Sequence, residues 1–160
     1  MFRYIFVGLL VAQISSADDV YNMAKQYEGV YRSVSCSRGD PYTPITITVN
    51  ELLSAAEISI ANAILPPMTY TAKQLPVTKY SVTKKQDWGC WKERTKVSLT
   101  PTRLMVEFQN RFYNACIVPS SKGRISKKES FELLGDTVHY SRTFEDDAGT
   151  DQEDCIFVRD

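Results

Sequence analysis

The sequence predicts an all-β domain: an antiparallel up-and-down barrel or sandwich of about seven to nine strands, preceded by one short helix. Three observations predict it. Apolar and polar residues alternate with a period of two through much of the chain. Short segments with turn-forming residues separate these runs. Four cysteines lie far apart, without the close pair of a metal knuckle, which predicts two disulfides.

The first residues have the layout of a secretory signal peptide. Arg3 supplies a positive charge, Tyr4–Val11 is uninterrupted and apolar, and a Ser-Ser-Ala cleavage site follows. The apolar run is shorter than the roughly 20 residues that span a membrane. We therefore expect residues 1–17 to be removed and residues 18–160 to form a single secreted domain, extracellular or, in a bacterium, periplasmic, with no membrane span.

The expected elements begin with an amphipathic helix over residues 19–28, which Gly29 ends. In the next strand we expect Val30, Val34 and Cys36 to share one face. A turn over 37–44 precedes a strand at 45–49. Residues 51–65 fit either a helix or a strand, and the β-branched residues favour the strand. Two further strands are expected at 69–75 and 77–84.

The second half of the chain has a stronger strand pattern. One expected face carries Trp91, Val97 and Leu99, and after a turn at 100–102 the core-facing residues are Leu104, Val106, Phe108 and Phe112. An acidic loop is expected at 146–154, and a final short strand at 155–158.

The clearest unit is a hairpin over residues 125–145, because Gly135-Asp136 reads as a two-residue turn that fixes the register. The predicted inner face pairs Leu133 with Val138, Phe131 with Tyr140 and Glu129 with Arg142; the other face pairs Glu132 with His139 and Ser130 with Ser141. Glu129 and Arg142 fit two situations: a buried pair at the mouth of a barrel, or an exposed pair beyond the end of the core.

Charge is unevenly distributed along the expected mature chain. Residues 18–72 carry 3 Lys and Arg against 6 Asp and Glu, residues 73–128 carry 13 against 3, and residues 129–160 carry 2 against 10. The basic middle and acidic end could form a bipolar surface that steers a partner. The interpretation we favour is that the two blocks neutralise each other across neighbouring strands.

Residues for catalysis are scarce. His139 is the only histidine, is expected on the solvent face, and has no nucleophile motif beside it. Cysteines used in disulfides leave too few ligands for zinc, and Gly149 does not sit where a calcium loop requires glycine. We therefore predict a non-enzymatic protein without cofactor or metal. Nucleic acid is not an expected partner of an exported protein.

Gly29-Val30-Tyr31 follows the expected helix and resembles the G-x-W start of the first strand in lipocalins, with Tyr31 in place of tryptophan. The resemblance implies an up-and-down barrel with an apolar cavity for a small ligand. In that arrangement a cysteine near the first strand could bond one near the last. Of the three possible pairings, we favour Cys36–Cys155 with Cys90–Cys116.

The predicted function is binding of a small hydrophobic molecule. The candidate lining is Val34, Trp91, Val97, Leu104, Val106, Phe108, Phe131, Leu133, Val138 and Tyr140, unless these residues simply fill a solid core. The predicted ligand-binding residues are Val34, Trp91, Phe108, Phe131, Glu129, Tyr140 and Arg142. The alternative is a secreted module that binds a protein or inhibits an enzyme through its basic and acidic surfaces.

Overall fold

A computed structural model describes residues 17–38, 44–62, 67–86 and 88–160. It confirms the all-β class, with one short helix and ten strands, so seven to nine was too low. The predicted signal peptide lies almost entirely outside the described residues. The elements are α1 (Ala17–Lys25), β1 (Gly29–Cys36), β2 (Ile45–Leu52), β3 (Ala55–Asn62), β4 (Met68–Ala72), β5 (Val77–Gln86), β6 (Gly89–Leu99), β7 (Arg103–Asn114), β8 (Val118–Leu134), β9 (Thr137–Asp146) and β10 (Gly149–Arg159).

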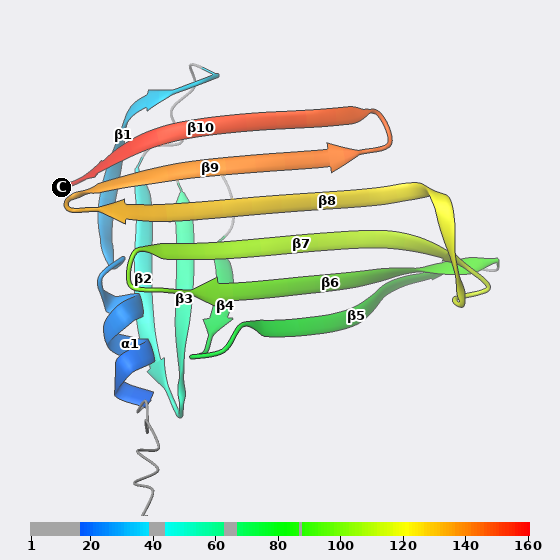
Figure 1. The fold of residues 1–160 in the computed structure, drawn as a ribbon, viewed down its shortest axis with the longest axis horizontal. Coiled ribbons are helices and arrows are strands. Elements are labelled where there is room, and N and C mark those ends of the chain that lie inside the picture. Colours follow the sequence, from blue (N-terminus) through cyan, green and yellow to red (C-terminus); the bar gives the residue numbers. More distant parts are fainter. Residues whose placement is uncertain (1–16, 39–43, 63–66, 87) are drawn as a thin grey trace, which may run out of the picture.

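All ten strands belong to one antiparallel sheet, in the order β4-β3-β2-β1-β10-β9-β8-β7-β6-β5. Strands β1–β4 run steeply across the direction of β5–β10 (Figure 1), so the sheet folds over onto itself. The corner is β1, which pairs with β2 through residues 29–31 and with β10 through residues 31–36. The edge strand β4 comes to lie against β6, which leaves a nearly closed barrel with a seam beside β4.

Helix α1 covers one end of this barrel (Figure 1). The helix expected over residues 19–28 is present, but it spans Ala17–Lys25. Val20, Ala24 and Tyr27 are buried. The hydroxyl of Tyr31 donates to the Tyr27 carbonyl oxygen at 2.7 Å. Arg159 on the last strand donates to the Tyr31 hydroxyl at 2.8 Å and to a backbone carbonyl at the end of the helix. These contacts tie the helix, the first strand and the last strand together.

The apolar core fills the half of the barrel next to α1. Its strand residues recur with a period of two, so each strand sends alternate side chains inward. The buried members from the strands are Tyr31, Ile45, Ile47, Val49, Ala56, Ile58, Ile60, Ala72, Val97, Leu99, Leu104, Phe131, Val138, Cys155 and Phe157.

The predicted hairpin register is confirmed at every position. Phe131 lies opposite Tyr140 and Glu129 opposite Arg142, and Glu132 lies opposite His139 on the outer face. The ambiguous segment 51–65 is a strand where the structure describes it, since β3 covers residues 55–62. A turn through Ser54 in the left-handed backbone region separates it from β2.

The expected acidic loop at 146–154 is wrong. Strand β9 continues to Asp146 and β10 starts at Gly149, so only a tight turn joins them. The error has a physical cause: Asp151 and Glu153 point into the barrel, where Arg142 pairs with both carboxylates. Alternation of apolar residues cannot reveal a strand whose inward positions are acidic.

The expected face of β1 is also wrong. Val34 is 66% exposed, whereas Tyr31 and Cys36 lie on the inner side. Val34 is an even number of residues from outward-facing Val30 and an odd number from buried Tyr31, so plain alternation directs both valines outward. A register shift between Ser33 and Ser35, where a β-bulge adds one residue, then brings Cys36 to the inner side. Val34 therefore does not line the interior.

One of the two expected disulfides is present. Cys36 and Cys155 are directly opposed on β1 and β10 and are bonded, across a sequence separation of 119 residues. Cys90 and Cys116 are free thiols. Their sulfur atoms nevertheless interact, since a hydrogen bond to Cys116 is the main cause that raises the pKa of the Cys90 thiol.

Candidate functional site

Beyond the apolar core, the inner face of the barrel carries a layer of charged side chains. Strand β8 contributes Lys127 and Glu129, β9 contributes Arg142, and β10 contributes Asp151 and Glu153. They continue the same inward-facing rows as the core residues of these strands. The fold thus places ionic groups where a solid barrel core would have apolar ones.

Glu129 is the centre of one half of this layer. It is only 3% exposed. Its Oε1 accepts a hydrogen bond from the Tyr140 hydroxyl at 2.8 Å and lies 2.9 Å from the Lys127 Nζ. The Tyr70 hydroxyl, on β4 across the barrel, donates to Oε2 at 3.5 Å. The buried carboxylate therefore has both a countercharge and hydroxyl donors, which burial of a charge requires.

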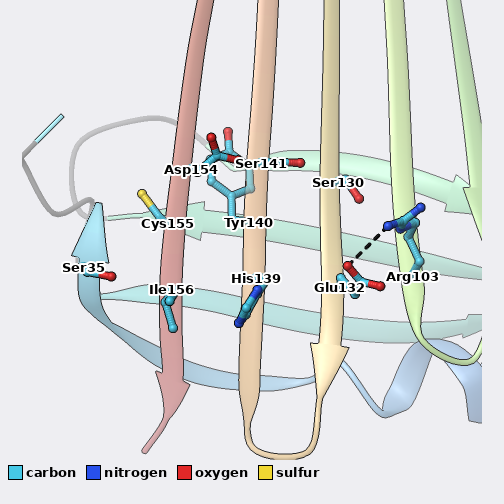
Figure 2. Close-up of a pocket in the computed structure, with 10 residues that line it drawn as sticks. All are labelled: Ser35, Arg103, Ser130, Glu132, His139, Tyr140, Ser141, Asp154, Cys155 and Ile156. Atoms are coloured by element: carbon cyan, nitrogen blue, oxygen red, sulfur yellow. Dashed lines mark hydrogen bonds and ion pairs between the residues drawn. The ribbon is translucent and has the colours of Figure 1, made fainter. Parts of the chain in front are cut away.

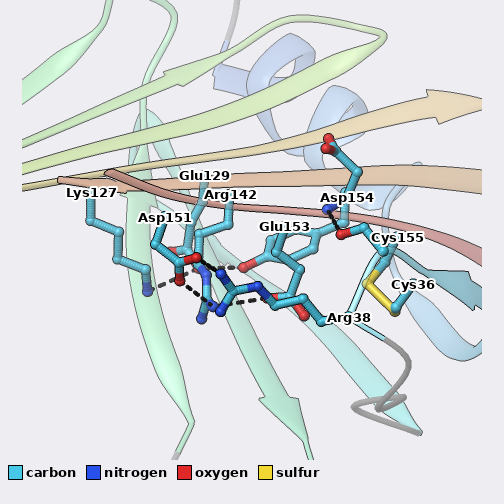
Figure 3. A network of polar contacts seen from close by, with 11 residues as sticks. Cys36, Arg38, Lys127, Glu129, Arg142, Asp151, Glu153, Asp154 and Cys155 are labelled. Carbon is cyan, nitrogen blue, oxygen red and sulfur yellow. Dashed lines mark hydrogen bonds and ion pairs between the residues drawn. A yellow bond between two sulfur atoms is a disulfide. The ribbon is translucent and has the colours of Figure 1, made fainter. Parts of the chain in front are cut away.

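Arg142 is the centre of the other half (Figure 3). Its Nη2 lies 2.9 Å from Oε2 of Glu153, which is 1% exposed, and 3.9 Å from Oδ2 of Asp151. Arg38, just after β1, also pairs with Asp151. Glu129 and Arg142 are thus opposite in register and both inward, but each is paired with other groups. Of the two situations considered from the sequence, the exposed pair is wrong, and the buried one holds only in that both side chains face inward.

The ionic layer is balanced in charge. Three carboxylates face three cations, which are Glu129, Asp151 and Glu153 against Lys127, Arg142 and Arg38. A guest bearing net charge would add an uncompensated charge to a partly desolvated site. The layer is therefore suited to an uncharged or zwitterionic guest that can hydrogen bond.

An apolar pocket of about 290 Å³ adjoins Glu129 inside the barrel. Its lining is Met68, Tyr70, Thr95, Val106, Phe108, Lys127 and Glu129. A second hollow of about 380 Å³ lies at the seam and shares Tyr70 and Thr95 with the first. Its other lining residues are Thr69, Thr71, Val77, Lys79, Tyr80, Ser81, Glu93 and Val97. The inner pocket therefore combines apolar walls with a hydrogen-bonding end, next to the seam.

The structure separates the predicted ligand-binding residues into four groups. Phe108 and Glu129 line the inner pocket, and Tyr140 and Arg142 belong to the ionic layer. Phe131 is buried in the core against Tyr140, with ring centroids 4.9 Å apart.

Trp91 and Val34 lie elsewhere. The indole of Trp91 packs edge-on against Phe112, with ring centroids 5.5 Å apart. A Cβ atom at Gly123 would come within 3.0 Å of the same indole, so the glycine leaves room for that ring. Trp91 thus packs near the beginning of β6, and Val34 faces outward.

Sequence reasoning missed seven residues of the site, which are Arg38, Met68, Tyr70, Thr95, Lys127, Asp151 and Glu153. Lys127 had a signal, since it shares the alternation of Glu129 and Phe131 on the strand. No sequence signal identified Tyr70, because it is 59 residues from Glu129 in the chain and approaches it only when the sheet folds over.

Two tyrosines of the site are expected to resist ionisation. Burial, and then the negative charge of Glu129, raise the pKa of Tyr70 and Tyr140 well above the ordinary value of about 10. Below about pH 10 both tyrosines keep their hydroxyl proton in the folded and in the unfolded chain, so their contribution to the free energy of unfolding is fully present. As the pH rises above about 10, the unfolded chain ionises first and the free energy of unfolding falls. Denaturant titrations at alkaline pH should show this fall, and Tyr140→Phe should make it shallower.

The outer face of the sheet carries a separate depression of about 460 Å³ (Figure 2), formed by residues of β1, β7, β8, β9 and β10. Its lining is Ser35, Arg103, Ser130, Glu132, His139, Tyr140, Ser141, Asp154, Cys155 and Ile156. Figure 2 draws one polar contact there, the 3.2 Å ion pair of Arg103 with Glu132, and His139 takes no part in it. The predicted outward position of His139 is confirmed.

Replacing His139 by alanine should leave the free energy of unfolding within about 0.5 kcal/mol of the wild-type value, as is usual for exposed residues. Urea unfolding of the two proteins measures the difference. A larger loss would show that the imidazole contributes to the fold in a way its exposed position does not suggest.

Within the described residues, no group of three or more His, Cys, Asp or Glu side chains is arranged to hold a metal ion. None of the helices in the described part of the chain is long and apolar enough to cross a membrane. Comparison with family models, curated proteins and solved structures finds no match to the chain.

Proposed function

We propose that this chain is an exported, non-enzymatic binding protein with a lipocalin-like barrel, which holds a small, largely apolar ligand in the pocket beside Glu129. The observation that carries the proposal is the combination of Met68, Val106 and Phe108 on the pocket walls with a buried, fully paired carboxylate at one end. Ligand sites typically combine apolar walls with few, fixed polar groups.

The chemistry of the pocket narrows the class of ligand. Its volume of about 290 Å³ lies at the small end of the range for ligand sites. The balanced ionic layer favours a ligand without net charge, with one hydrogen-bonding group directed at Glu129 or Tyr70 and an apolar body against Phe108. The seam beside Tyr70 and Thr95 gives this ligand a route into the barrel.

Export is supported from two sides. The first 17 residues have the layout of a signal peptide. The bond between Cys36 and Cys155 joins distant parts of the chain, as in proteins of oxidising compartments. We propose that in such a compartment Cys90 and Cys116 form a second disulfide, because their thiols are already in contact.

The alternative, a module that binds a protein through separate basic and acidic surfaces, has less support. Ion pairs connect the basic middle and the acidic end across neighbouring strands. Arg103 on β7 pairs with Glu132 on β8, and Arg124 on β8 pairs with Glu145 on β9. Lys127 pairs with Glu129 along β8 itself. The two charge blocks therefore neutralise each other in part, which is the interpretation we favoured from the sequence.

The experiment is a titration of the purified protein with an apolar fluorescent probe. Val106 is 4% exposed and lines the pocket, so Val106→Trp should fill it and weaken binding at least about tenfold, the equivalent of about 1.4 kcal/mol. Val158→Trp is the matched control, because Val158 lies on the last strand and is 40% exposed.

A second variant, Thr95→Phe, tests the same pocket if Val106→Trp does not fold. Thr95 lies between the inner pocket and the seam. Circular dichroism establishes that each variant is folded. Unchanged probe affinity in both folded pocket variants would show that the barrel interior is not the binding site.

A further inference from the structure

The long strands β5–β8 extend well past the crossing strands β1–β4 and form a projecting arm (Figure 1). Two turns meet at its end: the turn from β5 to β6, and the connection from β7 to β8. We call Trp88 together with Ala115–Val118 the arm tip. The backbone N–H of Ala115 donates to the Trp88 carbonyl oxygen at 2.9 Å, which joins the two turns.

The arm tip exposes three large apolar side chains. Ile117 is 78% exposed, Trp88 65% and Val118 59%. Their backbones are close together, because Gly89 and Val118 both lie opposite Asn114 on β7. The exposed ring of Trp88 packs on one side against Phe112, with ring centroids 4.4 Å apart. Isolated exposed apolar residues are ordinary, but a cluster of three at a protruding end marks an interaction surface.

The backbone of the tip is held in an unusual shape. Ala115 and Cys116 have φ angles of 48° and 60°, in the left-handed region that residues with a side chain seldom adopt. Hydrogen bonds from Cys116 to the Tyr113 carbonyl and from Ile117 to the Asn114 carbonyl fix this turn. Contact of Cys116 with Cys90 on β6 holds it from the side. The turn thus keeps Ile117 and Val118 directed outward.

Cations lie on the strand ends next to the apolar tip, together with one carboxylate, Asp147, which accepts hydrogen bonds from the backbone N–H groups of Gly123 and Arg124. Lys85, Arg111 and Lys122 are exposed on the strands next to the tip, and Lys92 lies over the ring of Tyr113. This charge attracts an anionic surface and repels a basic one.

We propose that the arm tip binds the surface of an anionic phospholipid membrane. The tip is convex and consists of two turns, so it offers much less area than the roughly 800 Å² per partner of a stable protein interface. A lipid surface, in contrast, takes up a few protruding apolar residues, and tryptophan favours its interfacial region. Lysine and arginine around the insertion point attract acidic headgroups.

Co-sedimentation with phosphatidylcholine vesicles, with and without phosphatidylserine, tests this proposal. The wild-type protein should bind the phosphatidylserine vesicles and bind less at high salt. Ile117→Ser with Val118→Ser should weaken binding at least about tenfold, because two apolar side chains leave the interface. Lys122→Glu should weaken it severalfold. Leu53→Ser, at a fully exposed turn elsewhere, is the matched control and should bind as the wild type does.

The tryptophan emission of the wild-type protein should shift to the blue when vesicles are added. The Trp88→Ser variant should not show this shift. Failure of the wild-type protein to bind phosphatidylserine vesicles overturns the proposal, and so does undiminished binding by the Ile117/Val118 variant. Binding of an acidic protein that needs the tip, without vesicle binding, would assign the surface to a protein partner instead. All these variants leave the barrel pocket intact, so probe binding there is expected to be unchanged.

Discussion

Replacing Glu129 by alanine is expected to lower the free energy of unfolding by about 3–5 kcal/mol. The carboxylate is 3% exposed and is the partner of Lys127 and of the hydroxyls of Tyr140 and Tyr70. Its removal leaves an ammonium and two hydroxyl groups without their acceptor inside the barrel, and the loss of one partner of a buried pair is costly. Urea unfolding at neutral pH measures the change.

Glu132→Ala is the matched control, three residues further along the same strand but on its outer face. Glu132 and its partner Arg103 are exposed to solvent, so this variant should lose less than about 1 kcal/mol. Similar losses for Glu129→Ala and Glu132→Ala would mean that the inner ionic layer is as hydrated as the surface. Glu129→Gln keeps a hydrogen-bond acceptor, so its loss of unfolding free energy should lie between those of Glu129→Ala and Glu132→Ala.

Removal of the Cys36–Cys155 disulfide should cost about 4–5 kcal/mol. The bond closes a loop with a sequence separation of 119 residues, and loops of this length restrict the unfolded chain most in the chain-entropy model. The bond also holds β1 against β10, the pairing that joins the two halves of the sheet. Urea unfolding of a Cys36→Ala/Cys155→Ala protein, compared with the oxidised wild type, measures the effect.

Cys90→Ala/Cys116→Ala provides the comparison for the second cysteine pair. In the proposed oxidised state this variant loses a shorter loop, so its unfolding free energy should fall by less than that of the Cys36/Cys155 variant. A Cys36/Cys155 variant as stable as the wild type would show that β1 and β10 remain associated without the bond.

The sequence predicted those parts of the fold that local chemistry specifies. The two-residue turn at Gly135-Asp136 fixed the register of β8 and β9, so the inward positions of Glu129, Phe131 and Tyr140 could be derived before any coordinates. The helix, which spans Ala17–Lys25, also followed from the spacing of Val20, Ala24 and Tyr27. Each of these features depends on residues that are close in the chain.

The errors occurred where distant residues decide the outcome. In β1 the buried residue is Tyr31, so Val30 and Val34 face outward, and a bulge that nothing in the local pattern marks brings Cys36 inward. Asp151 and Glu153 read as a solvated loop because their cationic partners come from β9 and the end of β1. Tyr70 and Met68 reach the pocket only because β4 lies across the barrel from β8. The pocket is therefore a product of sheet closure and has no local sequence signature.

Native mass spectrometry of the protein purified from its source tests whether the space between Val106, Phe108 and Glu129 holds a small ligand without net charge. The wild-type protein should carry the added mass of one small molecule, lost on unfolding and absent from Val106→Trp prepared in the same way. The same added mass on wild type and Val106→Trp, or a wild-type protein with the mass of its chain alone, would contradict the proposed ligand site.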